Sequence, residues 1–318
     1  MTTETDYSSF LIGGKYMIQS LIGSGSMSTV YKGIKRGTSK PVAVKIMKRN
    51  LIEDEEIVTR FVREVKACMT LEHKNIIRVF DAGTLSTGES YMVMEFLAGR
   101  SLADILESEK VLSPARAIEI ICQAADGLGV AHGRGYFHRD VKPENLMVVP
   151  SRFQRDCVKV LDFGVAKMAD SLNAGDKFAT APGDVLGTPL FMSPEQITGS
   201  KIDGRSDVYS LGCILYYCLC GKTPIQGDNA IAVMKNHLDA VPPHLNYYAP
   251  KRLPDEINFF VQRAIAKQAE DRYRSMSEFA SKLRELSTPP LLSKIQTMLG
   301  FDGKRRQTVS SSAKKVRR

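Results

Sequence analysis

The octapeptide His138-Arg139-Asp140-Val141-Lys142-Pro143-Glu144-Asn145 carries the strongest information about the fold of this 318-residue chain. Twenty-two residues beyond Asp140, the tripeptide Asp162-Phe163-Gly164 follows the apolar stretch 158–161. Turn-forming Asp and Asn residues without a catalytic role would explain single positions. They do not explain several residue types at fixed offsets in a strand-and-loop context.

The residue types in these two motifs suit phosphoryl transfer. Asp140 can accept a hydroxyl proton or orient the hydroxyl. Asn145 and Asp162 are hard oxygen ligands that suit Mg²⁺ bridging nucleotide phosphates. Lys142 is a compact cation for a γ-phosphate. The combination predicts a site that moves a phosphoryl group.

A glycine-containing loop, Ile22-Gly23-Ser24-Gly25-Ser26-Met27-Ser28-Thr29-Val30, lies between two β-rich stretches. Glycines allow a tight turn that brings backbone N–H groups close to phosphate oxygens. A hairpin that uses glycine for its geometry alone is the alternative. No GK[ST] follows, which excludes a Walker A loop, and the strand that comes next argues against a dinucleotide-binding fingerprint.

Lys45 ends the apolar stretch Val42-Ala43-Val44-Lys45, where burial would normally exclude a lysine. A buried lysine needs an acidic partner, whereas an exposed edge lysine does not. The helix expected over residues 52–71 offers Glu64, at the margin of an apolar stripe of Ile57, Phe61, Val65 and Cys68. For the acidic residues 53–56, stabilisation by the helix dipole is the simpler explanation, and Glu53 or Glu56 would be the next candidates as partner of Lys45.

Taken together, these motifs resemble the eukaryotic-type (Hanks-type) serine/threonine protein kinases over about residues 14–286. The string 187–196, Gly-Thr-Pro-Leu-Phe-Met-Ser-Pro-Glu-Gln, is most similar to the bacterial branch. The resemblance implies an α+β fold of two lobes. A small β-rich lobe with one key helix spans 14–95, and a larger, mainly helical lobe spans 96–286, with a hinge near Gly99. A flexible arm (1–13) would precede them, and an amphipathic stretch with a basic tail (287–318) would follow.

The resemblance also assigns roles residue by residue. Asp140 would be the catalytic base, with Lys142 beside it. Lys45 would hold the α- and β-phosphates and pair with Glu64, and Thr188 would hydrogen-bond the catalytic loop. Asn145 and Asp162 would be the metal ligands. The residues expected to contact the nucleotide are Ile22, Gly23, Ser24, Gly25, Ser26, Met27, Ser28, Thr29, Val30, Ala43, Lys45, Met94, Glu95, Leu97, Glu144 and Met147.

Two supporting contacts are implied as well. Asp207 would brace the backbone of the 138–140 motif from a buried helix, and Glu195 would pair with Arg272. The sequence departs from the family pattern at Ser28 (third loop glycine), Ser193 (alanine) and Ala269 (proline), and none of these changes removes a catalytic group.

We therefore expect a serine/threonine kinase that uses ATP with Mg²⁺, or Mn²⁺ in its place, on protein substrates. The alternative is a nucleotide-binding scaffold with a conformational output, which the retained Lys45, Asp140, Asn145 and Asp162 disfavour. A homodimer would allow trans-autophosphorylation. A phosphate on Thr180 or Ser171 would meet Arg139 and order the activation loop, unless that loop is ordered by packing alone.

Composition fits an ordinary globular protein, with 43% hydrophobic and 25% charged residues. The longest apolar run, residues 211–220, is ten residues long, whereas a membrane span needs about 20. The acidic, polar first ten residues do not resemble a signal peptide. Six cysteines without a CxxC pair indicate reduced thiols. These features predict a cytoplasmic protein.

The net charge of +9 comes mainly from residues 303–318, which hold seven basic residues and no acid. Removing these seven from 44 leaves 37 basic against 35 acidic groups in the body. A nucleic-acid or lipid-surface binder therefore rests on the tail alone. Thr308 and Ser310–Ser312 beside the basic run predict autophosphorylation that would release an acidic partner, although a passive, solubilising end is the simpler alternative.

Overall fold

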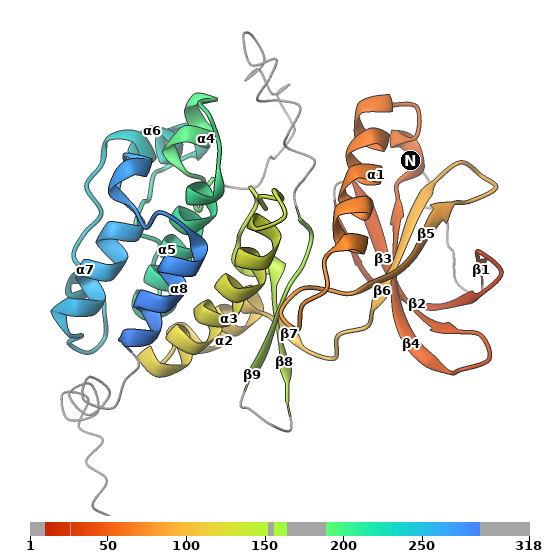
Figure 1. Ribbon diagram of the computed structural model, residues 1–318, viewed down its shortest axis with the longest axis horizontal. Helices are drawn as coiled ribbons and strands as arrows, with labels where there is room; N and C mark the ends of the chain where they lie inside the picture. The colour runs from red at the N-terminus through yellow and green to blue at the C-terminus, as the bar shows by residue number, and fades with distance from the viewer. Residues whose placement is uncertain (1–9, 26, 152–155, 164–188, 287–318) are drawn as a thin grey trace, which may run out of the picture.

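The computed structural model describes residues 10–25, 27–151, 156–163 and 189–286, apart from a few side chains within one helix. The described residues form two lobes side by side, one built around a sheet and the other around helices (Figure 1). This arrangement is the two-lobed α+β architecture expected from the sequence.

The smaller lobe is a six-stranded antiparallel sheet. Its strands are β1 (Leu11–Ile12), β2 (Tyr16–Ser24), β3 (Ser28–Lys35), β4 (Lys40–Met47), β5 (Val79–Thr84) and β6 (Ser90–Glu95), in the order β1-β2-β3-β4-β6-β5. The helix α1 (Glu55–Thr70) packs against β5 and β6.

The alternation of side chains along β4 places Lys45 on the α1 side of the sheet. Val44 and Ile46 belong to an apolar cluster with Ile12, whereas Met47 packs with Phe61 and Val65 of α1. Successive strand residues point to opposite faces. Lys45 therefore shares the face that α1 covers.

The larger lobe is mainly helical. It contains α2 (Leu102–Glu109), α3 (Pro114–His132), α4 (Pro194–Thr198), α5 (Gly204–Cys220), α6 (Ala230–Asp239), α7 (Asp255–Ala264) and α8 (Met276–Glu285). A small sheet of β7 (Arg100–Ser101), β8 (Leu146–Pro150) and β9 (Asp156–Val160) lies beside α3. The helix α5 is buried along nearly its whole length and contacts α3, α7 and α8, so it is the centre of this lobe.

Several boundaries differ from the sequence-based expectation. Residues 76–81 form a short β-rich run in the sequence, which predicts a strand there. The strand β5 begins only at Val79, because Ile76 bridges to Val160 and the Ile77 N–H donates to the Val160 carbonyl. Residues 11 and 12, expected in the loose arm, pair with β2, and Ile12 is fully buried. The helix α2 was not expected, although a Ser101–Asp104 capping box marks its start.

The junction between the lobes needs glycine at position 99. A Cβ atom there would collide with the carbonyl of Val148 in β8. The change of character near Gly99 in the sequence thus corresponds to a close approach of two backbones.

Two further expectations concern the body of the protein. All six cysteines are free thiols, five of them buried and Cys157 partly exposed. Within the described ranges, no helix is both long and apolar enough to cross a bilayer.

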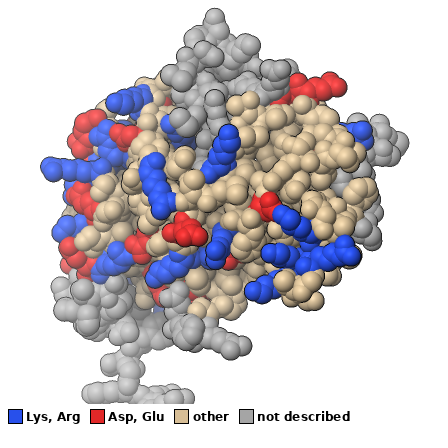
Figure 2. Space-filling view, turned by 45° about the vertical axis from the view of Figure 1, so that its right-hand side comes forward, with Lys and Arg blue, Asp and Glu red and all other residues tan. Residues whose placement is uncertain are grey.

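On the face shown in Figure 2, basic and acidic side chains are intermixed over much of the surface, as a nearly balanced body charge predicts.

Candidate active site

The loop 138–145 brings together the polar groups that its sequence predicted. The Lys142 Nζ lies 2.9 Å from Asp140 Oδ2. The Asn145 amide nitrogen donates to the Asp140 carbonyl at 2.8 Å, which leaves the amide oxygen to face another partner. The Asp140 side chain is 31% exposed, so the carboxylate is reachable by a substrate hydroxyl.

Asp207 of α5 supports this loop from below. Its Oδ1 accepts from the Arg139 N–H and its Oδ2 from the His138 N–H, each at 2.8 Å, and His132 Nε2 lies 2.7 Å from Oδ2. Burial alone would raise the pKa of Asp207, but these partners hold it below its ordinary value. The expected bracing contact is confirmed.

Backbone strain is concentrated at this site. Arg139 (φ 62°) and Asp162 (φ 43°) are two of the four described non-glycine residues with positive φ. Such conformations cost about 1–3 kcal/mol each and persist where surrounding contacts enforce them. For Arg139 those contacts include the Asp207 carboxylate.

Lys45 reaches Asp162 from the other lobe. Its Nζ lies 2.8 Å from Asp162 Oδ1, and the lysine side chain is 11% exposed against 42% for the aspartate. Burial raises the pKa of Asp162, but the Lys45 ammonium outweighs this and lowers the pKa below its ordinary value. Asp162 therefore stays ionised, as its expected role as a metal ligand would require.

The glycines of the loop between β2 and β3 are not explained by the protein's own geometry. Neither Gly23 nor Gly25 has a positive φ. A Cβ atom added at Gly23 would meet nothing within 4 Å, and one at Gly25 would make an ordinary 3.6 Å contact with the Ser28 carbonyl. Open space above an unobstructed glycine suits the close approach of a phosphate group. The contact of these glycines with phosphate stays a prediction beside the hairpin alternative, which the Gly25 N–H bond to the Ser28 carbonyl also fits.

The strand leading to the hinge is fixed by a polar contact across the lobes. The Glu95 Oε1 accepts from the Lys159 ammonium of β9 at 2.6 Å and from the Arg78 N–H at 2.8 Å. Met94 pairs in register with Ala43 of β4. The expected adenine neighbours thus come from β4, from β6 and, with Met147, from β8 of the other lobe.

An open cavity of about 410 Å³ lies beside the catalytic loop. Its wall is formed by Pro143 and Glu144 of that loop, by Leu190 and Phe191, and by residues of the helical lobe, Ala103, Tyr217, Gly221, Lys222, Thr223 and Gln226. The Glu144 side chain lies in this wall, and its contact with a nucleotide stays a prediction. The cavity is large enough to take side chains of an extended peptide.

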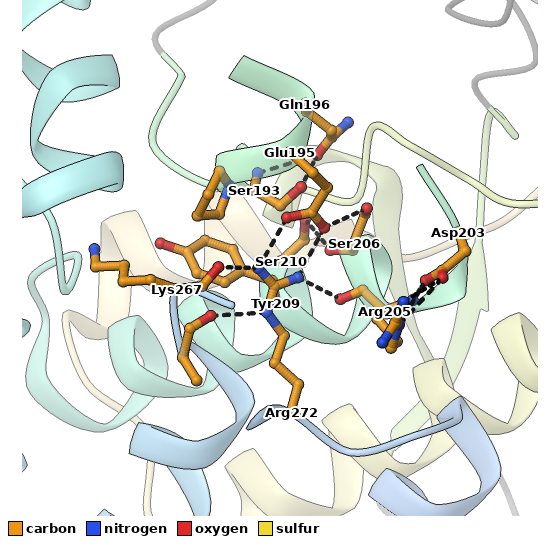
Figure 3. A network of polar contacts seen from close by, with 12 residues as sticks. Ser193, Glu195, Gln196, Asp203, Arg205, Ser206, Tyr209, Ser210, Lys267 and Arg272 are labelled. Atoms are coloured by element: carbon orange, nitrogen blue, oxygen red, sulfur yellow. Dashed lines mark hydrogen bonds and ion pairs between the residues drawn. The ribbon is translucent and has the colours of Figure 1, made fainter. Parts of the chain in front are cut away.

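Arg272 is the centre of a buried polar network in the larger lobe (Figure 3). Its guanidinium donates to both Glu195 oxygens, at 2.7 and 2.8 Å, and to the carbonyls of Arg205, Ala266 and Lys267. All five N–H donors of an arginine are thereby used. The pair expected from the sequence is confirmed.

Several expected residues lie outside what the structure describes. Ser26, Gly164, Ser171, Thr180 and Thr188 fall in undescribed segments, as do the arm 1–9 and residues 287–318. Glu64 is in α1, but its side chain is not described, so its pairing with Lys45 stays a prediction.

Some functional neighbours escaped the sequence analysis. Lys159, which holds Glu95, and His237, which lies behind residues 189–190, come from segments without a motif. The lysine does alternate with the buried Val158 and Val160 of β9, which was a usable indication that it faces away from the core of its lobe. The buried histidine gave no such indication.

Comparison with known proteins is consistent with this geometry. The family model described as Protein kinase domain matches residues 16–284. The chain is 40% identical over 285 residues to the serine/threonine-protein kinase pkn3 of Myxococcus xanthus, covering 89% of this chain and 52% of that protein. It is 36% identical over 310 residues to PknB of Mycobacterium tuberculosis, covering 95% and 47%. The chain thus spans about half the length of these relatives.

Solved structures share the fold. The crystal structure of the Mycobacterium tuberculosis PknI kinase domain superposes with a TM-score of 0.67 at 24% identity, covering 88% of this chain and 99% of that one. Rad53 1–466 in complex with AMP-PNP also gives a TM-score of 0.67 at 24% identity, covering 83% and 63%.

Proposed function

The chain belongs to the protein kinase family, and from this premise we propose that it is an active serine/threonine kinase that transfers the γ-phosphoryl group of ATP to protein hydroxyls. The observation that supports this best is the pairing of Asp140 with Lys142 in one lobe while Lys45 reaches Asp162 from the other. These are the groups that phosphoryl transfer needs for positioning and charge neutralisation.

Asp140, Lys142 and Lys45 each have a role in the proposed reaction. Asp140 orients the acceptor hydroxyl and takes its proton, because its carboxylate is accessible and its backbone is held by Asn145 and, through the preceding residues, by Asp207. Lys142 places a cation beside it, where negative charge develops. Lys45 orients the nucleotide phosphates beneath the loop 22–30.

A divalent cation fits the residues present. Asn145 and Asp162 supply oxygen ligands, and the Leu161 N–H donates to the Asn145 carbonyl at 2.9 Å, which ties the two segments together. Mg²⁺, with Mn²⁺ as a substitute, would neutralise charge on the β- and γ-phosphates there. The names of the bacterial relatives support serine and threonine as acceptors.

The direct test is incubation of the purified chain with radiolabelled ATP, Mg²⁺ and a generic basic protein. Labelled phosphoserine or phosphothreonine in the acceptor is expected, and labelling should disappear in Asp140→Asn and on addition of EDTA. Lys40→Met, a change of an exposed residue in the same strand as Lys45, should leave labelling intact. Labelling that persists in Asp140→Asn would contradict the assigned site.

We further infer that a phosphate in the 164–188 segment controls activity through Arg139. The Arg139 Nε is buried, and within the described residues it has no hydrogen-bond partner. Burial lowers the pKa of Arg139, partly opposed by Asp207. A phosphate on Thr180, or else on Ser171, would supply charge-assisted hydrogen bonds.

Phosphosite mapping of active protein should find one of these two residues modified. The Ser171→Ala/Thr180→Ala variant should lose most activity, and Arg139→Gln should make activity insensitive to phosphatase. Full activity in the double variant would reject this mechanism.

Two partners also belong to the proposal. A second copy of the chain would be the acceptor in trans-autophosphorylation, so the initial rate of self-labelling should rise with the square of enzyme concentration. An acidic partner would bind residues 304–318 until Thr308 or Ser310–Ser312 are phosphorylated. Binding of full-length and 1–302 protein to an anionic surface, before and after ATP treatment, tests this second point.

A further inference from the structure

His237 of α6 is a buried titratable group that the proposed reaction does not use. Its side chain is fully buried. The Nδ1 lies 2.8 Å from the Tyr209 hydroxyl of α5, and the two rings are 5.7 Å apart. The imidazole therefore connects α6 to the central helix of the lobe.

The other side of the ring faces the segment that begins at Pro189. The backbone carbonyls of Leu190 and Pro189 are close enough to raise the pKa of His237. Carbonyls accept and do not donate, so we assign the imidazole proton to Nε2, with Nδ1 accepting from the Tyr209 O–H. Nε2 has no partner of good hydrogen-bond geometry among the described residues.

The unpaired Nε2–H donor of His237 favours one position of residues 189–191. Leaving such a group unpaired costs about 1–3 kcal/mol, so free energy is gained when a carbonyl of residue 189 or 190 approaches it. A second contact acts in the same direction, because Ser210 Oγ of α5 donates to the Phe191 carbonyl at 2.7 Å. Both interactions favour a position of residues 189–191 close to α5 and α6 (Ser210 and Tyr209 are labelled in Figure 3).

The exposed side of this segment forms part of the cavity beside the catalytic loop. Leu190 and Phe191 share that cavity wall with Pro143 and Glu144, which follow Asp140 by three and four residues. A shift of residues 189–191 therefore changes the wall against which a peptide acceptor would lie. His237 does not line the cavity; it lies near the backbone of residues 189 and 190.

The ring is neutral at physiological pH. Burial is the main cause that lowers the pKa of His237, to about 4, and the Lys267 ammonium contributes in the same direction. Lys267 donates to the carbonyls of Asn236 and His237, so its charge is fixed near the ring. Among the described residues, Tyr209 of α5 and Lys267, which follows α7, are ionisable groups that act on His237.

We propose that His237 is a positioning residue for the protein acceptor: its neutral imidazole, held by Tyr209, places residues 189–191 so that the cavity beside Asp140 fits a peptide. This inference deepens the proposed kinase function and rests on it. It predicts that His237 governs KM for the protein acceptor and leaves KM for ATP unchanged.

Steady-state kinetics of His237→Leu, His237→Gln and Val233→Ala test the proposal. Leucine removes both polar contacts at similar volume, and KM for a generic protein acceptor should rise about tenfold or more, about 1.4 kcal/mol, with KM for ATP within about twofold. Glutamine can accept from Tyr209 and donate to a carbonyl, so it should restore much of the acceptor affinity. Val233, buried one turn earlier on α6, is the matched control. Its truncation should lower the unfolding temperature without a selective effect on the acceptor.

A second measurement separates failure of this inference from failure of the proposed function. Hydrogen exchange of the backbone amides in residues 190–193 should accelerate in His237→Leu and in Tyr209→Phe, and not in Val233→Ala. If the wild type transfers no phosphate, the kinase function is rejected and exchange alone decides whether His237 holds the segment. Unchanged acceptor KM with an active wild type, or unchanged exchange, would overturn the positioning role.

The pH profile of stability tests whether the ring is buried and neutral, as the assignment of its proton requires. Because His237 is neutral when folded and titrates near 6.5 when unfolded, the unfolded state binds more protons as pH falls from about 6.5 to 4. Wild type should therefore lose stability over that range, and His237→Gln should lose less. Parallel profiles would contradict the buried neutral ring.

Discussion

The ion pairs Arg272–Glu195 and Lys45–Asp162 each join a cation to a carboxylate, but they differ in how fully they are buried and hydrogen-bonded. Arg272 and Glu195 are 0% and 11% exposed, and the guanidinium has all five donors in use. Lys45 and Asp162 are 11% and 42% exposed, and they come from different lobes. In the first pair, protein atoms satisfy all donors of the arginine, whereas in the second pair the carboxylate of Asp162 is partly exposed.

This difference in exposure predicts that the first pair stabilises the fold and that the second pair takes part in ligand binding. A buried pair with every hydrogen bond made is costly to break, because one partner is left charged and unpaired. A pair with an exposed member can exchange partners when a charged ligand binds, since water solvates its charges in the meantime. The following substitutions should therefore act on stability in one case and on activity in the other.

The largest expected effect is that of Arg272→Met on folding. The substitution leaves the Glu195 carboxylate and several carbonyls without their donor, which should lower the free energy of unfolding by about 3–5 kcal/mol. Urea denaturation followed by circular dichroism measures this. Arg274→Met, an exposed neighbour, should change it by less than about 0.5 kcal/mol.

A double variant sharpens this prediction. If the cost comes from an uncompensated charge, Arg272→Met together with Glu195→Met should recover part of the stability lost in the single variant. A double variant no more stable than Arg272→Met would show that packing of the arginine stem, and not its charge, dominates.

Lys45→Met should produce the opposite pattern. Removing the cation that orients phosphates should lower kcat/KM by about 10²–10³-fold, the magnitude typical of a lost electrostatic contact in a transition state. The unfolding midpoint should move little, because water can reach Asp162. Nucleotide-dependent phosphorylation and a thermal melt measure the two quantities on one sample. A large loss of stability in Lys45→Met would show that both ion pairs stabilise the fold, and it would contradict the distinction between them.

Acid should act on the Arg272–Glu195 pair through Glu195. Burial raises the pKa of Glu195, but Arg272 outweighs it and holds the pKa below the usual 4.5. The pair's contribution is thus present above about pH 4.5 and is lost as pH falls through the folded-state value. Urea midpoints between about pH 3 and 7 should fall less steeply in the double methionine variant than in wild type. Equal slopes would show that other carboxylates account for the acid sensitivity.

The smallest expected effect concerns the open space above Gly23. Gly23→Ala should leave stability almost unchanged and raise KM for ATP roughly three- to tenfold, about 0.7–1.4 kcal/mol, because the new methyl group occupies phosphate space. Gly37, with φ 79° and also nothing within 4 Å of an added Cβ, is the control. Gly37→Ala should cost stability through backbone strain and leave KM unaltered.

The sequence predicted those parts of the site that short motifs encode. Asp140, Lys142, Asn145 and Asp162 could be placed because their spacing within or after one loop fixes their relations. Asp207 and the Glu195–Arg272 contact could be expected by resemblance. Strand β5 was misplaced, because Ile76 and Ile77 pair with β9 of the other lobe, a contact that no local pattern reveals. His237 escaped for the same reason, since its burial depends on α5 and on residues 189–190.

The two oxygens of Asp207 have a consequence for damaged copies of the protein. They belong to the central helix of the larger lobe, yet they hold the strained backbone at His138 and Arg139 in place. When that helix loosens, Asp140 is no longer held and the strained conformation relaxes. A partly unfolded copy thus loses the geometry at Asp140 together with its core, and under the proposed function it would also lose its activity. The geometry of the loop 138–145 therefore depends on the folding of α5.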